Sequence, residues 1–153
     1  MTWPGLAIAV HLLAVLWWIG GLAFVTLVLL PALRAEFNDQ SHALLSAIER
    51  RFAPQARLAV VLVGASGIYL LWAFDLWRVL GQLSFWWLDA MIGYWLVFAM
   101  ILFVIEPLGV LQRLIFVGQD PAIAWRRFHA LHAVLLGLAV IIIAAATAGS
   151  HGF

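Results

Sequence analysis

The chain has 153 residues, of which 67% are hydrophobic and only 10% charged, and its mean hydropathy is +1.10. Soluble domains are about 45–50% apolar and about 25% charged, so this composition excludes an ordinary water-soluble domain and predicts a protein solvated by lipid. The net charge of +1 excludes a general attraction to nucleic acid, and the lack of cysteine excludes disulfides, thiolate zinc sites and thiol catalysis.

Four stretches are long and apolar enough for transmembrane helices, which need roughly 20 mainly apolar residues. In chain order they cover about residues 5–33, 58–74, 85–110 and 128–148. Between the first two, apolar side chains at helical spacing over about residues 41–52 predict a short amphipathic helix on the cytoplasmic membrane surface. We therefore expect one transmembrane domain over 1–153, with an all-α four-helix bundle as its fold.

The arginines predict how the bundle is oriented, because the chain has eight of them and no lysine. Seven lie in the first and third connections or at the start of the second helix: Arg34, Arg50, Arg51, Arg57, Arg113, Arg126 and Arg127. The connection between the second and third helices holds only Arg78. Since positively charged loops stay in the cytoplasm, we expect both termini on the outer, periplasmic side of a bacterial inner membrane.

Two local patterns bear on the organisation of the chain. Arg51-Phe52 precedes the second helix and Arg127-Phe128 precedes the fourth, as a duplicated helix pair would produce. Arginine–aromatic pairs are common at membrane borders, so the sequence alone favours coincidence. Pro107 lies inside the third stretch and is expected to kink it.

A first layer of polar side chains lies in the outer half of the predicted bundle. Polar groups inside a bilayer are costly and usually mark function or a partner. His11 lies about six residues, roughly 9 Å, below the outer end of the first helix. Imidazole and thioether groups bind copper, so His11, Met91 and His151 predict an outer copper site. Alternatively, His11 only bonds a carbonyl or hydroxyl on a neighbouring helix, and Asp89 only caps the third helix.

A second layer lies in the inner half. His129 and His132 are three residues apart and share one face of the fourth helix. Arg126 and Arg127 lie just before them and are predicted either to hold acidic groups of a cofactor or to anchor the helix at lipid phosphates. Glu106, on the third helix, is expected to pair with an arginine, Arg57 or Arg113.

Haem b is the other candidate for a cofactor, and it needs histidine ligands, an apolar slot and cations near its propionates. His11 would be an outer axial ligand, with Met91 or His151 opposite. His132 or His129 would hold an inner haem. His11 and His132 are separated by roughly 15–20 Å along the membrane normal, so two haem sites are needed if both are ligands.

The first two helices carry a resemblance to a known family. The run His11-Leu-Leu-Ala-Val-Leu-Trp-Trp-Ile-Gly-Gly and the segment Glu49-Arg-Arg-Phe-Ala-Pro resemble the bacterial copper-resistance protein D family. The histidine in the first helix is also similar to that of the HemJ-type protoporphyrinogen oxidases, which are small haem-b-binding membrane proteins. These resemblances imply copper handling or haem binding in a four-helix membrane protein, with His11 as the residue to which they apply.

Three functions follow as hypotheses. The leading one is a haem-b protein that passes electrons in the membrane to a redox partner or within a larger complex or homo-oligomer. The second is a copper-binding or copper-transporting protein. The third is an accessory membrane subunit without a cofactor. No hydrolase motif such as a nucleophile elbow or a zincin helix is present in the sequence.

Overall fold

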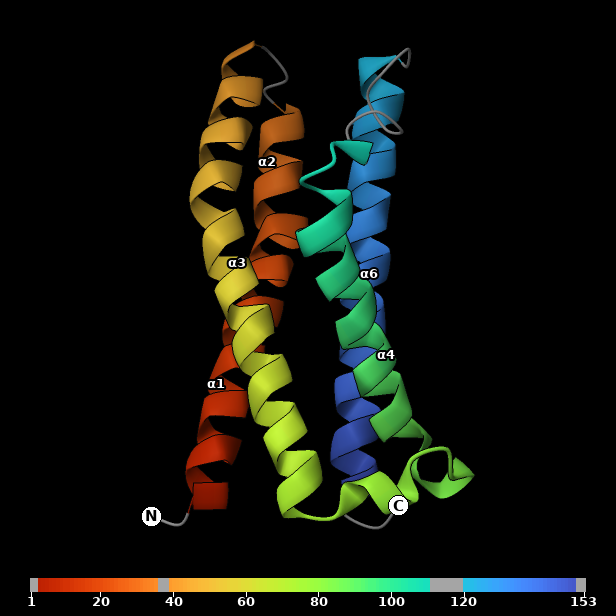
Figure 1. The fold of residues 1–153 in the computed structure, drawn as a ribbon. Coiled ribbons are helices and arrows are strands. Elements are labelled where there is room, and N and C mark those ends of the chain that lie inside the picture. Colours follow the sequence, from red (N-terminus) through yellow and green to blue (C-terminus); the bar gives the residue numbers. More distant parts are fainter. Residues whose placement is uncertain (1–2, 36–38, 111–119, 151–153) are drawn as a thin grey trace.

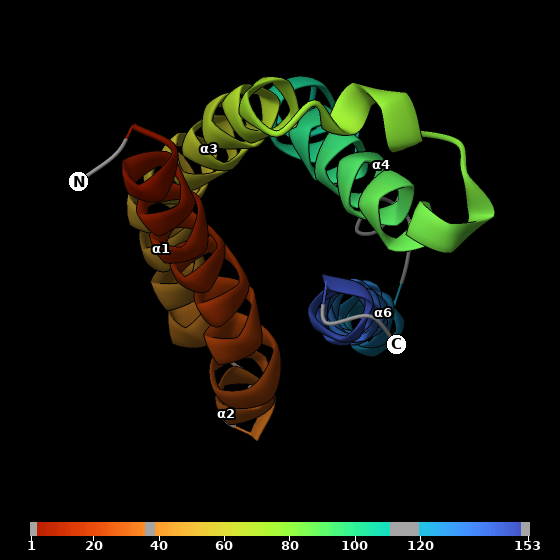
Figure 2. The same cartoon turned by 90° about the horizontal axis from the view of Figure 1, so that it is seen from below.

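The computed structural model of the protein describes residues 3–35, 39–110 and 120–150. These residues form four long helical segments and no strand, which confirms the all-α four-helix bundle. The first segment begins, and the fourth ends, at the end of the bundle where the second is joined to the third (Figure 1). Seen along the bundle, α1, α3, α4 and α6 follow one another around the molecule, and α6 closes it by contacting α1 (Figure 2).

Each segment contains a stretch that is long and apolar enough to cross a membrane. These stretches are Trp3–Arg34, Ala47–Ala73, Leu83–Ile105 and Ala122–Gly149. Large apolar side chains remain exposed on all of them, for example Leu13, Leu62, Val97 and Ile141. The bundle therefore has an apolar outside as well as an apolar core.

The first segment changes its helical register near its end. It runs through α1 (Trp3–Phe24), the π-helix η1 (Val25–Leu29) and α2 (Leu30–Ala35). In η1 the N–H of Leu30 bonds the carbonyl of Val25, five residues back. Pro31 comes next and has no N–H. In the π-helical register, the Thr26 carbonyl would accept a hydrogen bond from the backbone N–H at position 31, which proline lacks. The Thr26 carbonyl therefore needs a donor from another part of the chain.

The third segment repeats this arrangement. It runs through α4 (Trp86–Met100) and the π-helix η4 (Ile101–Ile105), where Glu106 N–H bonds the Ile101 carbonyl at 2.8 Å. Pro107 follows, and the carbonyl left without a backbone donor is that of Leu102. The chain then turns at Gly109, whose φ of +64° favours glycine. Pro107 therefore disturbs the third helix as expected, through a π-helical turn.

The second and fourth segments are longer than hydropathy predicted. The expected amphipathic helix and the second transmembrane stretch form one helix, α3 (Asp39–Ala73), with the exposed Pro54 inside it. Helix α6 (Pro121–Ser150) begins about two turns before residue 128. Asp120 caps its start, since Oδ1 accepts the Ala122 N–H at 2.7 Å, and Pro121 occupies the first helical position, where no N–H is needed.

The two helix pairs repeat one pattern at a fixed separation. Pro31 and Pro107 lie 76 positions apart, as do Arg51-Phe52 and Arg127-Phe128. The same separation relates core positions, all buried or half-buried: Trp18 to Tyr94, Leu22 to Phe98, Ala59 to Leu135 and Val63 to Ala139. The rings of Trp18 and Tyr94 approach each other across the bundle, with centroids 5.7 Å apart. The shared separation favours a duplicated helix pair over the coincidence that the sequence suggested.

Two short 3-10 helices connect α3 to α4. They are η2 (Leu76–Val79) and η3 (Leu83–Phe85). Gly81 lies between them with a φ of +77°, and its N–H bonds both oxygens of Asp89, at 3.3 and 3.1 Å. Asp89 therefore fastens this connection to the first turn of α4, instead of capping the helix.

Candidate functional site

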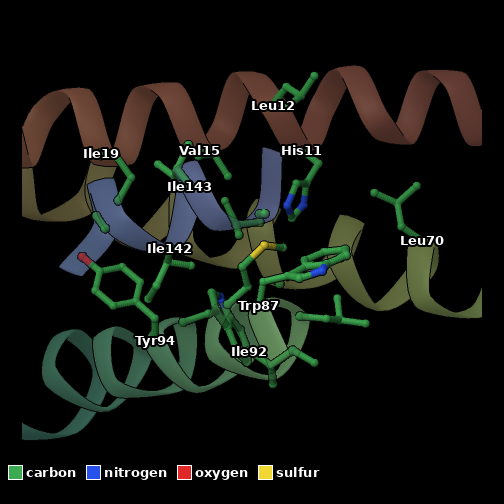
Figure 3. A pocket seen from close by; sticks show the side chains of 18 of the residues that line it. His11, Leu12, Val15, Ile19, Leu70, Trp87, Ile92, Tyr94, Ile142 and Ile143 are labelled. Carbon is green, nitrogen blue, oxygen red and sulfur yellow. The ribbon is translucent and has the colours of Figure 1, made fainter. Parts of the chain in front are cut away.

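A cavity of about 660 Å³ lies between α1, α3, α4 and α6, in the half of the bundle nearest the α3–α4 connection. Its walls are almost entirely apolar, and the described residues that line it include no charged side chain. Figure 3 shows His11 pointing from α1 into the space bordered by Trp87 of α4 and by Ile142 and Ile143 of α6. The cavity is partly open at its rim, and an apolar pocket of this size is typical of sites for small ligands and cofactors.

His11 is held in this wall by a hydrogen bond across the helix pair. Its Nδ1 lies 2.9 Å from Ser66 Oγ on α3. Ser66 Oγ in turn donates to the carbonyl of Leu62 at 2.5 Å. Gly67 lies beneath the imidazole, where a Cβ would come within 3.4 Å of His11 Cε1. This confirms that His11 bonds a hydroxyl on a neighbouring helix, and that bond uses only one of its two ring nitrogens.

Among the other polar groups that line the cavity, those of Tyr94 and Trp95 are engaged by protein atoms, whereas the indole N–H groups of Trp18 and Trp87 are buried without a hydrogen-bond partner among the described residues. The Tyr94 hydroxyl donates to the Leu135 carbonyl at 2.9 Å, and Trp95 Nε1 donates to the Val60 carbonyl at 2.8 Å. Trp87 packs its indole nitrogen against Gly149, so this N–H is turned toward α6. The second ring nitrogen of His11, Nε2, and the indole N–H groups of Trp18 and Trp87 are therefore polar groups with which this cavity can hold a ligand.

Met91 and Trp87 complete the side of the cavity that α4 forms. Met91 is a lining residue together with His11, so the structure brings these two predicted ligands to one site. Trp87 lies 76 positions after His11 and lines the same cavity, so the two repeats contribute equivalent positions to it. His151, the third predicted outer ligand, lies outside the described residues.

In the inner half, His129 already has a structural partner. Its Nε2 lies 3.1 Å from the Thr26 carbonyl, which is the group left without a donor by Pro31. An unpaired buried carbonyl costs about 1–3 kcal/mol, so this bond explains a histidine at position 129 without a cofactor. The predicted ligand role of His129 would have to use its other nitrogen.

Arg57 supplies a side-chain donor to a backbone carbonyl of the third segment, as His129 does in the first. Its Nε donates to the Leu102 carbonyl at 3.2 Å, the group left without a donor by Pro107. Its Nη2 also lies 3.3 Å from Glu106 Oε1, which confirms the expected pairing of Glu106 with an arginine. Sequence reasoning missed the link between each proline and its donor.

His132 bonds within its own helix. Its Nδ1 lies 3.0 Å from the Phe128 carbonyl, and its ring centroid lies 4.4 Å from that of Phe128. Neither His129 nor His132 lines the cavity that contains His11. Arg126 and Arg127 are exposed at the start of α6. The structure therefore separates the inner residues from the outer site.

Side chains that could bind a metal ion without a macrocycle do not cluster in the described part of the chain. No three histidine, aspartate or glutamate side chains lie close enough there to hold one metal ion. Ser66, which bonds His11, is the site residue that sequence reasoning missed. Its position in the Gly-Ala-Ser-Gly run (64–67) was the available signal.

Comparison of the chain with protein-family models, with curated protein sequences and with solved structures finds no match. The resemblance of the first two helices to the copper-resistance protein D family, and that of His11 to the HemJ-type proteins, therefore stay predictions.

Proposed function

We propose that this chain is an integral membrane protein of the bacterial inner membrane with both termini on the outer side. Four stretches of sufficient length, the apolar outer surface and the bias of arginines toward two of the three connections support this arrangement. In this orientation the cavity with His11 lies in the outer leaflet.

We further propose that the cavity binds a b-type haem and that the protein transfers electrons in the membrane. The observation that carries this proposal is His11 in the wall of a large apolar cavity, with Nδ1 bonded to Ser66 and Nε2 left for a ligand. Metal-bound histidines commonly donate their other ring N–H to a protein acceptor in this way. When bound, haem would supply one-electron chemistry.

The residues present supply a histidine and an apolar slot for such a group, whereas the described lining of the cavity supplies no cation for its propionates. The volume of about 660 Å³ lies within the range of roughly 300–1,000 Å³ that is usual for small-molecule sites. His11 would hold the iron through Nε2, while Trp18, Tyr94 and the isoleucines of α6 exclude water from it. Met91 shares the cavity, and its thioether would be a second ligand to the metal. A methionine–histidine pair favours a higher reduction potential than two histidines.

An absorption spectrum tests the haem proposal directly. The protein, expressed in haem-replete cells and purified in detergent, should show a Soret band and reducible visible bands. His11→Ala should lose most of the bound haem, and added imidazole should restore part of it. Thr26→Val is the control, because Thr26 is buried outside the cavity and its hydroxyl bonds the Leu22 carbonyl, and it should keep the spectrum. A colourless wild-type protein would contradict the proposal.

The number of haems per chain tests the two-site hypothesis. One haem, lost in His11→Ala and kept in His132→Ala, would restrict binding to the outer cavity. Two haems, one lost in each variant, would support a path for electrons across the membrane through His132 or His129, with Arg126 and Arg127 near the inner propionates.

Copper binding is the second candidate, because the cavity brings an imidazole and a thioether together at His11 and Met91. Both are ligands that Cu(I) accepts. Metal analysis of the same preparation separates the candidates, since copper would be found without a Soret band and would be lost in His11→Ala and Met91→Leu. A protein with neither haem nor copper would favour an accessory subunit that acts through membrane partners or a second copy of itself.

A further inference from the structure

The hydroxyl proton of Ser66 is donated to a backbone carbonyl of its own helix and is therefore not available to His11. Its Oγ lies 2.5 Å from the Leu62 carbonyl, a distance at which two oxygens need a proton between them, and 3.2 Å from the Val63 carbonyl. A hydroxyl has one proton to donate. Ser66 Oγ must therefore accept in its 2.9 Å bond with His11, and the imidazole proton lies on Nδ1.

This proton position decides what His11 can offer to a ligand. In a neutral imidazole with the proton on Nδ1, Nε2 is a bare lone pair. A lone pair binds a metal centre, whereas it repels a ligand that presents only carbonyl oxygens. With the opposite tautomer, Nε2 would carry a hydrogen and could not bind a metal.

We infer that Ser66 is the positioning residue of the site: it fixes the tautomer and orientation of His11, so that the cavity selects a macrocycle with a metal centre over the same macrocycle without one. The inference rests on the proposed function and deepens it by naming what distinguishes the ligand.

The neighbours of Ser66 on α3 fix its side chain and leave space for the His11 ring. Ser66 is only 8% exposed, and its bond to the Leu62 carbonyl, one turn earlier on α3, fixes its rotamer. Gly67 follows it and leaves room for the imidazole, since even a methyl group there would touch His11 Cε1. The chain from His11 through Ser66 to Leu62 also polarises the ring and raises the electron density at Nε2.

A measurement on the protein without ligand tests the tautomer. Histidine labelled with ¹⁵N, in protein reconstituted into lipid nanodiscs, reports by NMR which ring nitrogen carries hydrogen. The His11 signal, identified by its loss in His11→Ala, should show hydrogen on Nδ1. Ser66→Ala should shift the population toward Nε2–H, because His11 loses its hydroxyl acceptor and keeps only its hydrogen bond to the backbone of Val63. A wild-type His11 with hydrogen on Nε2 would overturn the inference, whether or not haem binds.

Titration with two macrocycles tests the selection. Hemin and metal-free protoporphyrin IX have the same outline and differ in the metal. Ser66→Ala should weaken hemin binding by about 10–100-fold and leave binding of the metal-free macrocycle unchanged. Ser66→Thr keeps the hydroxyl and should retain hemin affinity.

Thr26→Val is the control for losing a buried hydroxyl that bonds a carbonyl one turn back, and it should change neither affinity. An equal loss for both macrocycles in Ser66→Ala would mean that Ser66 only shapes the cavity, and would overturn the inference. If wild-type protein binds no hemin, the proposed function fails, and the NMR measurement still decides the role of Ser66.

Discussion

Histidine has two ring nitrogens, and the hydrogen bond of His11 to a side chain uses Nδ1. A hydrogen bond to a neighbouring helix and a ligand role were alternatives at the level of sequence. The structure shows that the bond to Ser66 takes Nδ1 and leaves Nε2 at the cavity. The two alternatives are therefore compatible, and the hydrogen bond supports the ligand role by fixing the ring.

Gly64 shows at a single residue how closely α3 and α4 approach. A Cβ at this position would overlap the ring of Trp95, whose Nε1 donates to the Val60 carbonyl at 2.8 Å. Gly64→Ala should displace the ring, break this bond and lower the free energy of unfolding by about 1–3 kcal/mol. Unfolding in mixed detergent micelles, followed by tryptophan fluorescence, measures the change.

Gly137 provides the control, because no described atom lies within 4 Å of its would-be Cβ. Gly137→Ala should leave the unfolding free energy unchanged or raise it by up to about 1 kcal/mol, since alanine is the better helix former. Equal losses in the two variants would contradict the packing argument.

At the scale of elements, each π-helical turn depends on a side chain from another segment. His129 supplies the donor for Thr26 of the first segment, and Arg57 supplies it for Leu102 of the third. His129→Ala should cost about 1–3 kcal/mol of unfolding free energy, because the Thr26 carbonyl is left unpaired.

Pro31→Ala, combined with His129→Ala, should recover much of that loss, because the new backbone N–H can bond the helix again. Comparing the two single variants with the double variant isolates this coupling. Strictly additive effects would show that Pro31 and His129 act independently.

The sequence predicted the elements better than their registers and ends. Long apolar runs determine that four helices form, and a hydropathy window detects them. The π-helical turn at Val25–Leu29 depends on His129, which is 103 positions from the carbonyl that it bonds, so a local pattern cannot reveal it. The early start of α6 was readable from Asp120-Pro121, a cap followed by a first-turn proline.

The candidate site could be predicted only where a local sequence pattern reveals a residue. A histidine in an apolar helix stands out in the sequence, so His11 was found. Ser66 did not stand out, because a small hydroxyl residue between glycines is typical of close helix packing. Its role depends on α1 and α3 being paired so that positions 11 and 66 meet, which only the tertiary structure shows.

At the scale of the whole molecule, the proposed orientation can be tested on a clean background, because the native chain has no cysteine. Ser84→Cys lies in the α3–α4 connection, and Ala122→Cys lies at the start of α6, at the opposite end; both positions are exposed. A maleimide that cannot cross membranes should label Ser84→Cys in intact cells. It should label Ala122→Cys only after the inner membrane is opened, and the reverse pattern would contradict the orientation.

The cavity lies between two helix pairs that share one residue pattern, but its lining side chains differ at matching positions. His11 and Trp87 occupy matching places in the two helix pairs, yet one is an imidazole and the other an indole. A ligand with a metal centre would therefore find an imidazole on the α1 side of the cavity and an indole at the matching position of α4. The matched positions 11 and 87 therefore give two sides of the cavity different chemistry, although the two helix pairs share one pattern.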